Sequence, residues 1–113
     1  MSEDKQTMLV ALDNLATYMD EVEARMLLAD EWRNGGKVGP RPKSIGSMEK
    51  PAGVGTLNGF GGCPSAETVR KARQWLDARD DVASLKHYLA PDHEGNVPAA
   101  RFASWAVTAY NLS

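Results

Sequence analysis

The feature that most constrains the fold is a periodic run of apolar residues near the N-terminus. Over residues 8–33, apolar side chains recur at alternating spacings of four and three, which predicts one long helix with a heptad seam. The seam consists of Met8, Leu12, Leu15, Met19, Val22, Met26 and Ala29. Further apolar residues widen the stripe, which favours a helix packed against several neighbours over a two-stranded coiled coil. These are Leu9, Ala16, Leu27, Leu28 and Trp32.

A second constraint is the segment that follows, because residues 34–64 show neither helical nor sustained strand periodicity. This segment contains nine of the ten glycines and four of the six prolines. It lacks the Gly-Lys-Ser/Thr of a phosphate-binding loop and the spacing of a dinucleotide fingerprint. A connection of this length is typical of a functional or disordered segment. We therefore predict a long irregular loop over residues 34–64.

Three shorter helices are predicted after this loop. The first covers residues 65–79 and begins at a serine that can cap its first turn. A short helix starts at Asp80 or Asp81 and ends before Pro91, and the last begins with Pro98 in its first turn and continues to the end of the chain. Trp32 lies on the apolar stripe of the helix over residues 8–33, and Trp75 and Trp105 lie on those of the later helices, so we expect all three to be buried. The pattern predicts an all-α, compact four-helix domain that spans residues 1–113.

Composition and the single cysteine limit the possible functions. The hydrophobic fraction of 42% and the charged fraction of 25% are typical of a globular domain. The N-terminus lacks the pattern of a secretory signal, so we expect a cytoplasmic protein with no membrane partner. Cys63, His87 and His93 match no compact metal-ligand spacing, and no pattern joins them into a nucleophile and its base. We expect no enzymatic activity, no metal and no cofactor.

The net charge of −2 is unevenly distributed. Residues 1–33 carry eight acidic and three basic side chains, whereas residues 34–51 carry four basic and one acidic. The helix over residues 8–33 is therefore a candidate either for homodimerisation or for occupying a basic partner, with a plain core helix as the simplest alternative. The basic loop is a candidate for contacting an acid-rich protein or nucleic acid, and we expect it to hold a protein partner. The residues predicted to do so are Lys37, Arg41, Lys43 and Phe60.

The helix over residues 65–79 provides the best nucleic-acid signal in the chain. Arg70, Lys71 and Arg73 are residue types that contact phosphates and base edges when a helix enters the major groove. However, Glu67 precedes Lys71 by four residues and Arg73 precedes Asp77 by four, so ordinary intrahelical ion pairs can account for much of this charge. The pI of about 5.6 also argues against a dedicated DNA-binding domain.

The order of these parts is similar to that of small phage antitermination regulators. The resemblance is carried by a helix that ends in Leu-Ala-Asp-Glu-Trp32, by the Gly/Pro/Ser-rich loop, and by a helix that leads into Leu85-Lys-His-Tyr88. It implies a phage or mobile-element origin and a regulatory role in transcription. In that family a helix-turn-helix normally follows, whereas residues 96–113 of this chain supply one helix.

Two functions from different classes follow. The leading prediction is a non-enzymatic regulatory or inhibitory adaptor that holds a protein partner with the 34–64 loop and adjoining helix faces. The alternative is a transcription regulator, antiterminator-like, that binds DNA or the transcription machinery through the basic helix over residues 65–79.

Overall fold

The computed structural model describes residues 3–35, 48–55, 57 and 63–112. Within these residues it confirms the all-α class, with four α-helices and no strand. The long helix α1 spans Glu3–Arg33, and α2 spans Ala66–Asp77. A 3-10 turn, η2 (Ala83–Leu85), leads directly into the short helix α3 (Lys86–Leu89), and α4 spans Ala99–Ala109.

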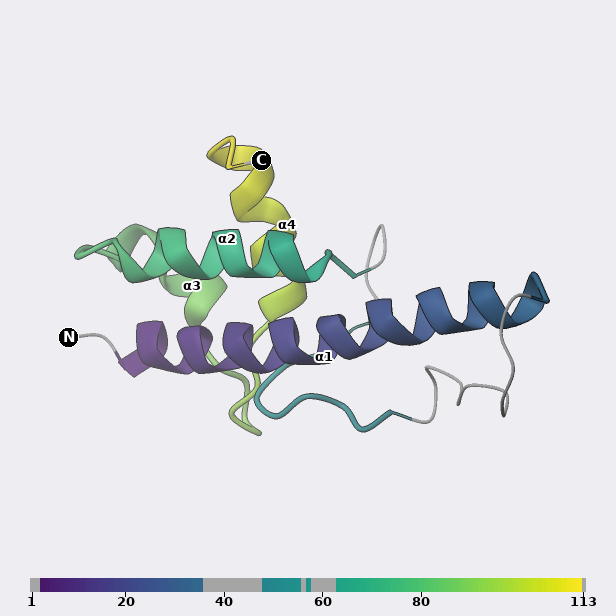
Figure 1. Cartoon of the computed structure of the whole chain (residues 1–113). Coiled ribbons are helices and arrows are strands. Elements are labelled where there is room, and N and C mark those ends of the chain that lie inside the picture. Colours follow the sequence, from purple (N-terminus) through teal and green to yellow (C-terminus); the bar gives the residue numbers. More distant parts are fainter. Residues whose placement is uncertain (1–2, 36–47, 56, 58–62, 113) are drawn as a thin grey trace.

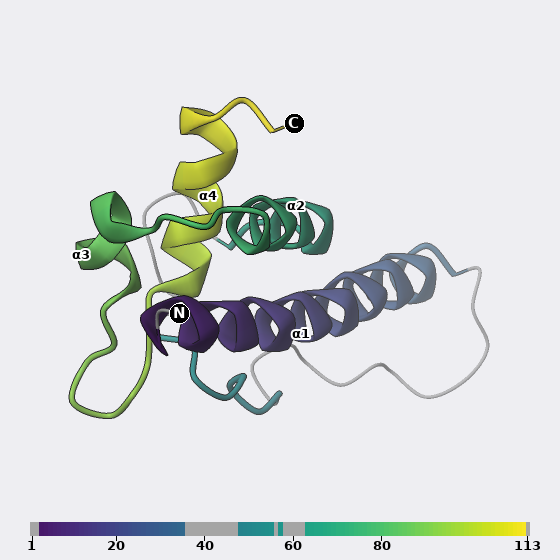
Figure 2. The ribbon, with the colours of Figure 1, turned by 90° about the vertical axis from the view of Figure 1, so that its left-hand side faces the viewer.

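The core lies where three helices meet. Helix α2 runs antiparallel to the N-terminal half of α1, and α4 crosses both of them at a steep angle (Figure 1; Figure 2). The seam of α1 faces this junction, and its side chains are buried from Met8 to Val22. The largest of the fully buried side chains come from these three helices and from α3. They include Phe102, Met8, Leu12, Leu15, Leu76 and Leu89.

Helix α2 begins where the sequence predicts, because Ser65 caps it. The Ser65 hydroxyl accepts a hydrogen bond from the backbone N–H of Thr68 at 3.2 Å. Ser65→Ala should therefore lower the free energy of unfolding by about 1 kcal/mol, measured by urea denaturation. Ser104→Ala, which removes an exposed hydroxyl inside α4, is the matched control and should change it by less than about 0.5 kcal/mol. Equal losses in the two variants would contradict the capping role.

The last helix ends earlier than predicted. The sequence pattern continues to the end of the chain, but α4 stops at Ala109 and Asn111 adopts a positive φ of 52°. The N–H of Leu112 then donates to the carbonyl of Val107 at 3.1 Å, which is the closing bond of a Schellman motif. Asparagine tolerates this left-handed conformation better than most residues, so a local backbone preference overrides the apolar periodicity.

Part of the predicted irregular loop belongs to the core. Val54 is buried and forms an isolated parallel bridge with Val97, which precedes α4. The N–H of Gly55 donates to the Val97 carbonyl at 2.8 Å, and the N–H of Val97 donates to the Gly53 carbonyl at 2.9 Å. Asn14 of α1 donates its side-chain amide to the Ala52 carbonyl at 2.9 Å. These bonds tie residues 52–55 both to α1 and to the start of α4.

Candidate interaction surface on α1

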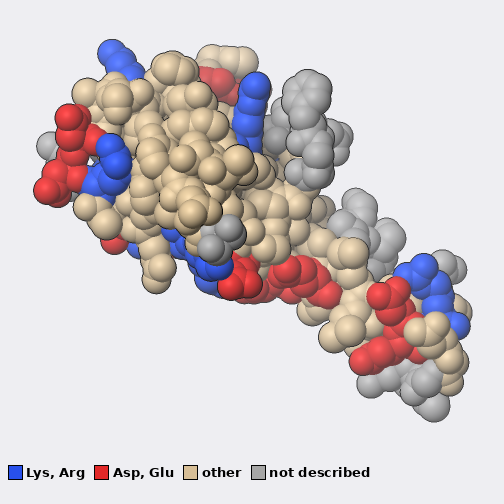
Figure 3. Space-filling model, turned by 90° about the horizontal axis from the view of Figure 1, so that it is seen from above, with Lys and Arg blue, Asp and Glu red and all other residues tan. Residues whose placement is uncertain are grey.

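Helix α1 extends beyond the helices that pack on it. A 31-residue helix is about 46 Å long, whereas α2 has only 12 residues. Val22 is the last buried residue of α1, and residues 23–33, which we call the arm, project from the body (Figure 1; Figure 3). Four large apolar side chains of the arm are exposed. Their exposed fractions are 53% for Met26, 62% for Leu27, 42% for Leu28 and 38% for Trp32.

These four side chains lie on more than one side of the arm. Successive helical residues are rotated by about 100°, so Met26 continues the seam that α2 and α4 cover nearer the N-terminus. Leu28 and Trp32 are about 200–240° further around the helix and point to the opposite side. One neighbouring helix could not cover both sides. The expectation that all three tryptophans are buried is thus wrong for Trp32, because α1 extends beyond the helices that pack on it.

The ion pairs of the arm leave negative charge on it. Arg25 pairs with Glu21 at 2.8 Å, and Arg33 pairs with Asp30 three residues earlier. Glu23 and Glu31 are exposed and form no ion pair with any described residue. The arm therefore presents exposed apolar side chains beside two carboxylates that form no ion pair with a described residue.

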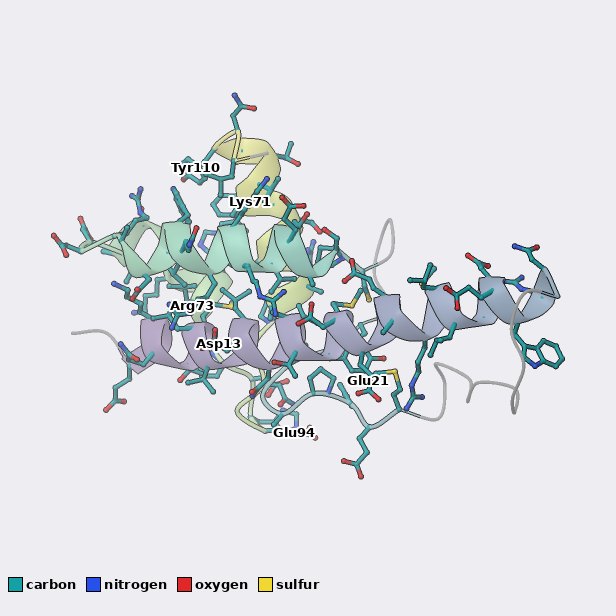
Figure 4. All side chains as sticks on the ribbon, in the orientation of Figure 1. Asp13, Glu21, Lys71, Arg73, Glu94 and Tyr110 are labelled. Atoms are coloured by element: carbon teal, nitrogen blue, oxygen red, sulfur yellow. The ribbon has the colours of Figure 1, made fainter. Side chains whose placement is uncertain are left out.

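The predicted nucleic-acid residues of α2 are engaged with carboxylates. Arg73 donates through Nε to Asp13 at 2.9 Å (Figure 4). Arg70 donates to both carboxylate oxygens of Asp20, so both arginines bridge α2 to α1. Lys71 lies on the side of α2 that faces away from α1 and pairs with Glu67 at 3.3 Å. The structure thus brings the acidic helix and the basic helix together.

The sequence had indicated only the intrahelical pairs of α2. Both are present, because Lys71 pairs with Glu67 and Arg73 approaches Asp77 at 3.4 Å. The pairs between α2 and α1 were not predicted, since they join residues 50 and 60 positions apart. Opposite charges on two adjacent helices are the only sequence signal that could have suggested them.

The pair between Asp20 and Arg70 should make stability depend on pH. Its hydrogen bond lowers the pKa of the Asp20 carboxyl from the ordinary value of 3.8 and raises the pKa of Arg70. The contribution is therefore complete above pH 3.8 and is lost as the pH falls through the lowered folded-state pKa. A double-mutant cycle of Asp20→Asn and Arg70→Gln should show a small coupling at pH 7 that vanishes below that pKa. Coupling that persists in acid would contradict an ionic pair.

The loop residues predicted to hold a partner, Lys37, Arg41, Lys43 and Phe60, lie outside the described residues. Their role stays a prediction.

The cysteine and the histidines have separate surroundings. The Cys63 thiol is exposed and donates to the Leu57 carbonyl at 3.3 Å. The His87 ring lies beside that of Tyr88 at a centroid distance of 4.5 Å, and His93 is 3.6 Å from Glu94. Within the described ranges, no group of three or more histidine, cysteine, aspartate or glutamate side chains is arranged to hold a metal ion.

An aromatic cluster that sequence reasoning missed lies between α2, α3 and α4. The Trp75 ring stacks on Tyr110 at 4.3 Å, and the Tyr88 ring stacks on Trp105 at the same distance. The Arg79 guanidinium lies 4.8 Å from the centre of the Trp75 ring, and its Nε has no hydrogen-bond partner among the described residues. The rings pack against one another by stacking, so this cluster joins the three helices.

Comparison with protein-family models, with curated proteins and with solved structures found no match. Among the described residues, no helix has both the length and the apolar character needed to cross a membrane.

Proposed function

We propose that the protein is a non-enzymatic regulatory or inhibitory adaptor of the cytoplasm that binds a protein partner through the arm and the adjoining loop. The observation that carries this proposal is the exposure of four large apolar residues on a projecting helical segment. Contiguous exposed apolar surface is typical of protein interaction sites. Methionine and tryptophan are also enriched at the centres of such interfaces.

The concentration of these residues distinguishes the arm from an ordinary surface helix. Six large apolar residues are exposed in the described part of the chain, and four of them fall within positions 26–32. The other two, Val10 and Tyr110, lie elsewhere. Isolated exposed apolar residues need no explanation, whereas a cluster on a helix suits insertion into a partner's groove.

Affinity capture tests this function. The tagged full-length protein is incubated with lysate of its native host, with and without nuclease, and the retained material is identified. We expect a stoichiometric protein that nuclease does not release. Retention that disappears with nuclease, or no stoichiometric protein at all, would contradict the adaptor function.

The contribution of the loop is tested separately with the triple variant of Arg41, Lys43 and Phe60 to alanine. If the loop helps to hold the partner, this variant should retain less of the captured protein while its helical circular dichroism is unchanged. Undiminished capture would reject the loop as a contact surface and leave the arm.

The alternative function, a transcription regulator that binds DNA through Arg70, Lys71 and Arg73, stays a second proposal. The ion pairs of these residues weigh against it, because a phosphate would have to displace a carboxylate from each of them. It predicts duplex binding whose affinity falls steeply with salt concentration. Absence of duplex binding at low salt would remove it.

A further inference from the structure

We propose that the arm takes a basic amphipathic helix of the partner, seated along the seam beyond the point where α2 begins. This inference rests on the proposed adaptor function and specifies the chemistry of the partner. The surface concerned, which we call the seam extension, consists of Met26 and Leu27 with the acidic side chains of Glu23 and Glu31 beside them.

The seam extension continues a surface that already binds a helix. Val22 is buried, with an exposed fraction of 7%, and Met26 follows it at the next seam position with 53% exposed. Ala29 is the next seam residue and is half-buried. The same apolar stripe is therefore buried as far as Val22 and exposed at Met26. A second helix could extend the packing along the same line.

The way α2 binds α1 shows which chemistry this surface accepts. Helix α2 buries an apolar stripe that includes Val69, Ala72 and Leu76. Beside that stripe, Arg73 and Arg70 pair with Asp13 and Asp20 of α1. An apolar stripe flanked by arginines is thus the pattern that matches the α1 surface.

The row of acids on α1 continues into the arm. Asp13 and Asp20 are seven residues apart, which is close to two turns, and Glu31 follows Asp13 by eighteen residues, or about five turns. All three carboxylates therefore lie along the same flank of α1. The first two are taken by the arginines of α2, whereas Glu31 has no ion pair with any residue that the structure describes. A partner helix with Lys or Arg beside its apolar stripe would form the corresponding ion pair with Glu31.

A second copy of the chain fits this surface poorly. In a homodimer, the rest of each chain must not collide with its partner. The two arms would therefore have to pair antiparallel about a two-fold axis near residues 26 and 27. Such an axis places Glu23 of one copy opposite Asp30 of the other, twice in the same interface. Like charges directly opposite are destabilising, whereas a basic partner removes the repulsion.

Three synthetic 18-residue peptides test the inference with the full-length protein. The first has a leucine stripe flanked by arginines, the second has the same stripe flanked by glutamates, and the third is a scrambled order of the first with equal charge. Binding is measured by fluorescence anisotropy at two salt concentrations. We expect the first peptide to bind at least about tenfold more tightly than the other two. Equal binding of the first and third peptides would overturn the proposal, because it would show charge attraction without recognition of the stripe.

Two variants and a control locate the site. Met26→Ser with Leu27→Ser should weaken binding of the arginine-flanked peptide by about tenfold or more. Glu31→Arg should weaken it by about two- to fivefold and improve binding of the glutamate-flanked peptide. Val10→Ser, at a residue of the same helix that is 56% exposed, should leave both affinities unchanged. A loss in Val10→Ser as large as that in the double variant would overturn the assignment to the seam extension.

The result separates this inference from the adaptor function. If a host protein is captured but only the glutamate-flanked peptide binds, the inference fails and the adaptor function stands. If sedimentation shows self-association that the Met26→Ser, Leu27→Ser variant abolishes, a second copy occupies the seam extension and the inference is overturned.

Discussion

Phe102→Ala should lower the free energy of unfolding by about 3–5 kcal/mol, the largest stability loss we expect from one substitution. The Phe102 side chain is wholly buried at the junction of α1, α2 and α4. Its ring centre lies 6.2 Å from that of Trp75 and 5.9 Å from that of Trp105. Removing it leaves a cavity against two large rings that stacking holds in place. Since total stability is typically about 5–15 kcal/mol, urea denaturation followed by tryptophan fluorescence should show a much lower midpoint.

The control for Phe102→Ala is Val10→Ala, because Val10 lies on the outer side of α1. This substitution should change the free energy of unfolding by less than about 0.5 kcal/mol. A loss of less than about 1 kcal/mol in Phe102→Ala would contradict the location of the core at this three-helix junction.

Replacing all four exposed apolar residues of the arm by glutamine should abolish partner binding without unfolding the body. Glutamine has good helix propensity, and none of the four side chains belongs to the buried core. We expect the affinity for the captured protein to fall by about a hundredfold or more, because interface energy is concentrated in a few large side chains. The urea midpoint should stay close to that of the unmodified protein. The substituted residues are Met26, Leu27, Leu28 and Trp32.

Binding of the captured protein to this variant is measured by isothermal titration calorimetry, with Val10→Gln as the control. The control carries the same kind of substitution on the same helix but outside the arm, so its affinity should be unchanged. Unchanged affinity in the fourfold variant would contradict the assignment of the arm as the contact surface.

Local patterns predicted most of the helices, because their causes are local. The seam predicted α1 from residue 8, whereas the helix begins at Glu3, and Gly35, with a φ of 72°, lies two residues beyond its last residue, as expected for a glycine after a helix. Ser65 predicted the start of α2, and Asp81 accepts a hydrogen bond from the Ala83 N–H at the start of η2. The seam alone could not predict which of its residues is the last to be buried, because that residue depends on the position of α2 along α1.

The remaining features depend on contacts between distant segments. The pairs of Arg70 and Arg73 with α1, the bridge between Val54 and Val97, and the aromatic cluster each join residues far apart in the chain. No periodicity within one segment encodes such contacts. The sequence favoured the loop as the contact surface and assigned the apolar residues of the arm to the core. The structure adds the arm to the candidate surface, because these residues are exposed.

Hydrogen–deuterium exchange with and without the captured partner tests whether the arm is the contact surface. In the protein alone, amides of residues 23–33 should exchange faster than those of residues 8–22, because the arm lacks neighbouring helices. We predict that the partner slows exchange in residues 23–33 far more than anywhere in α2 or α4. Protection confined to α2, with none in the arm, would contradict the account.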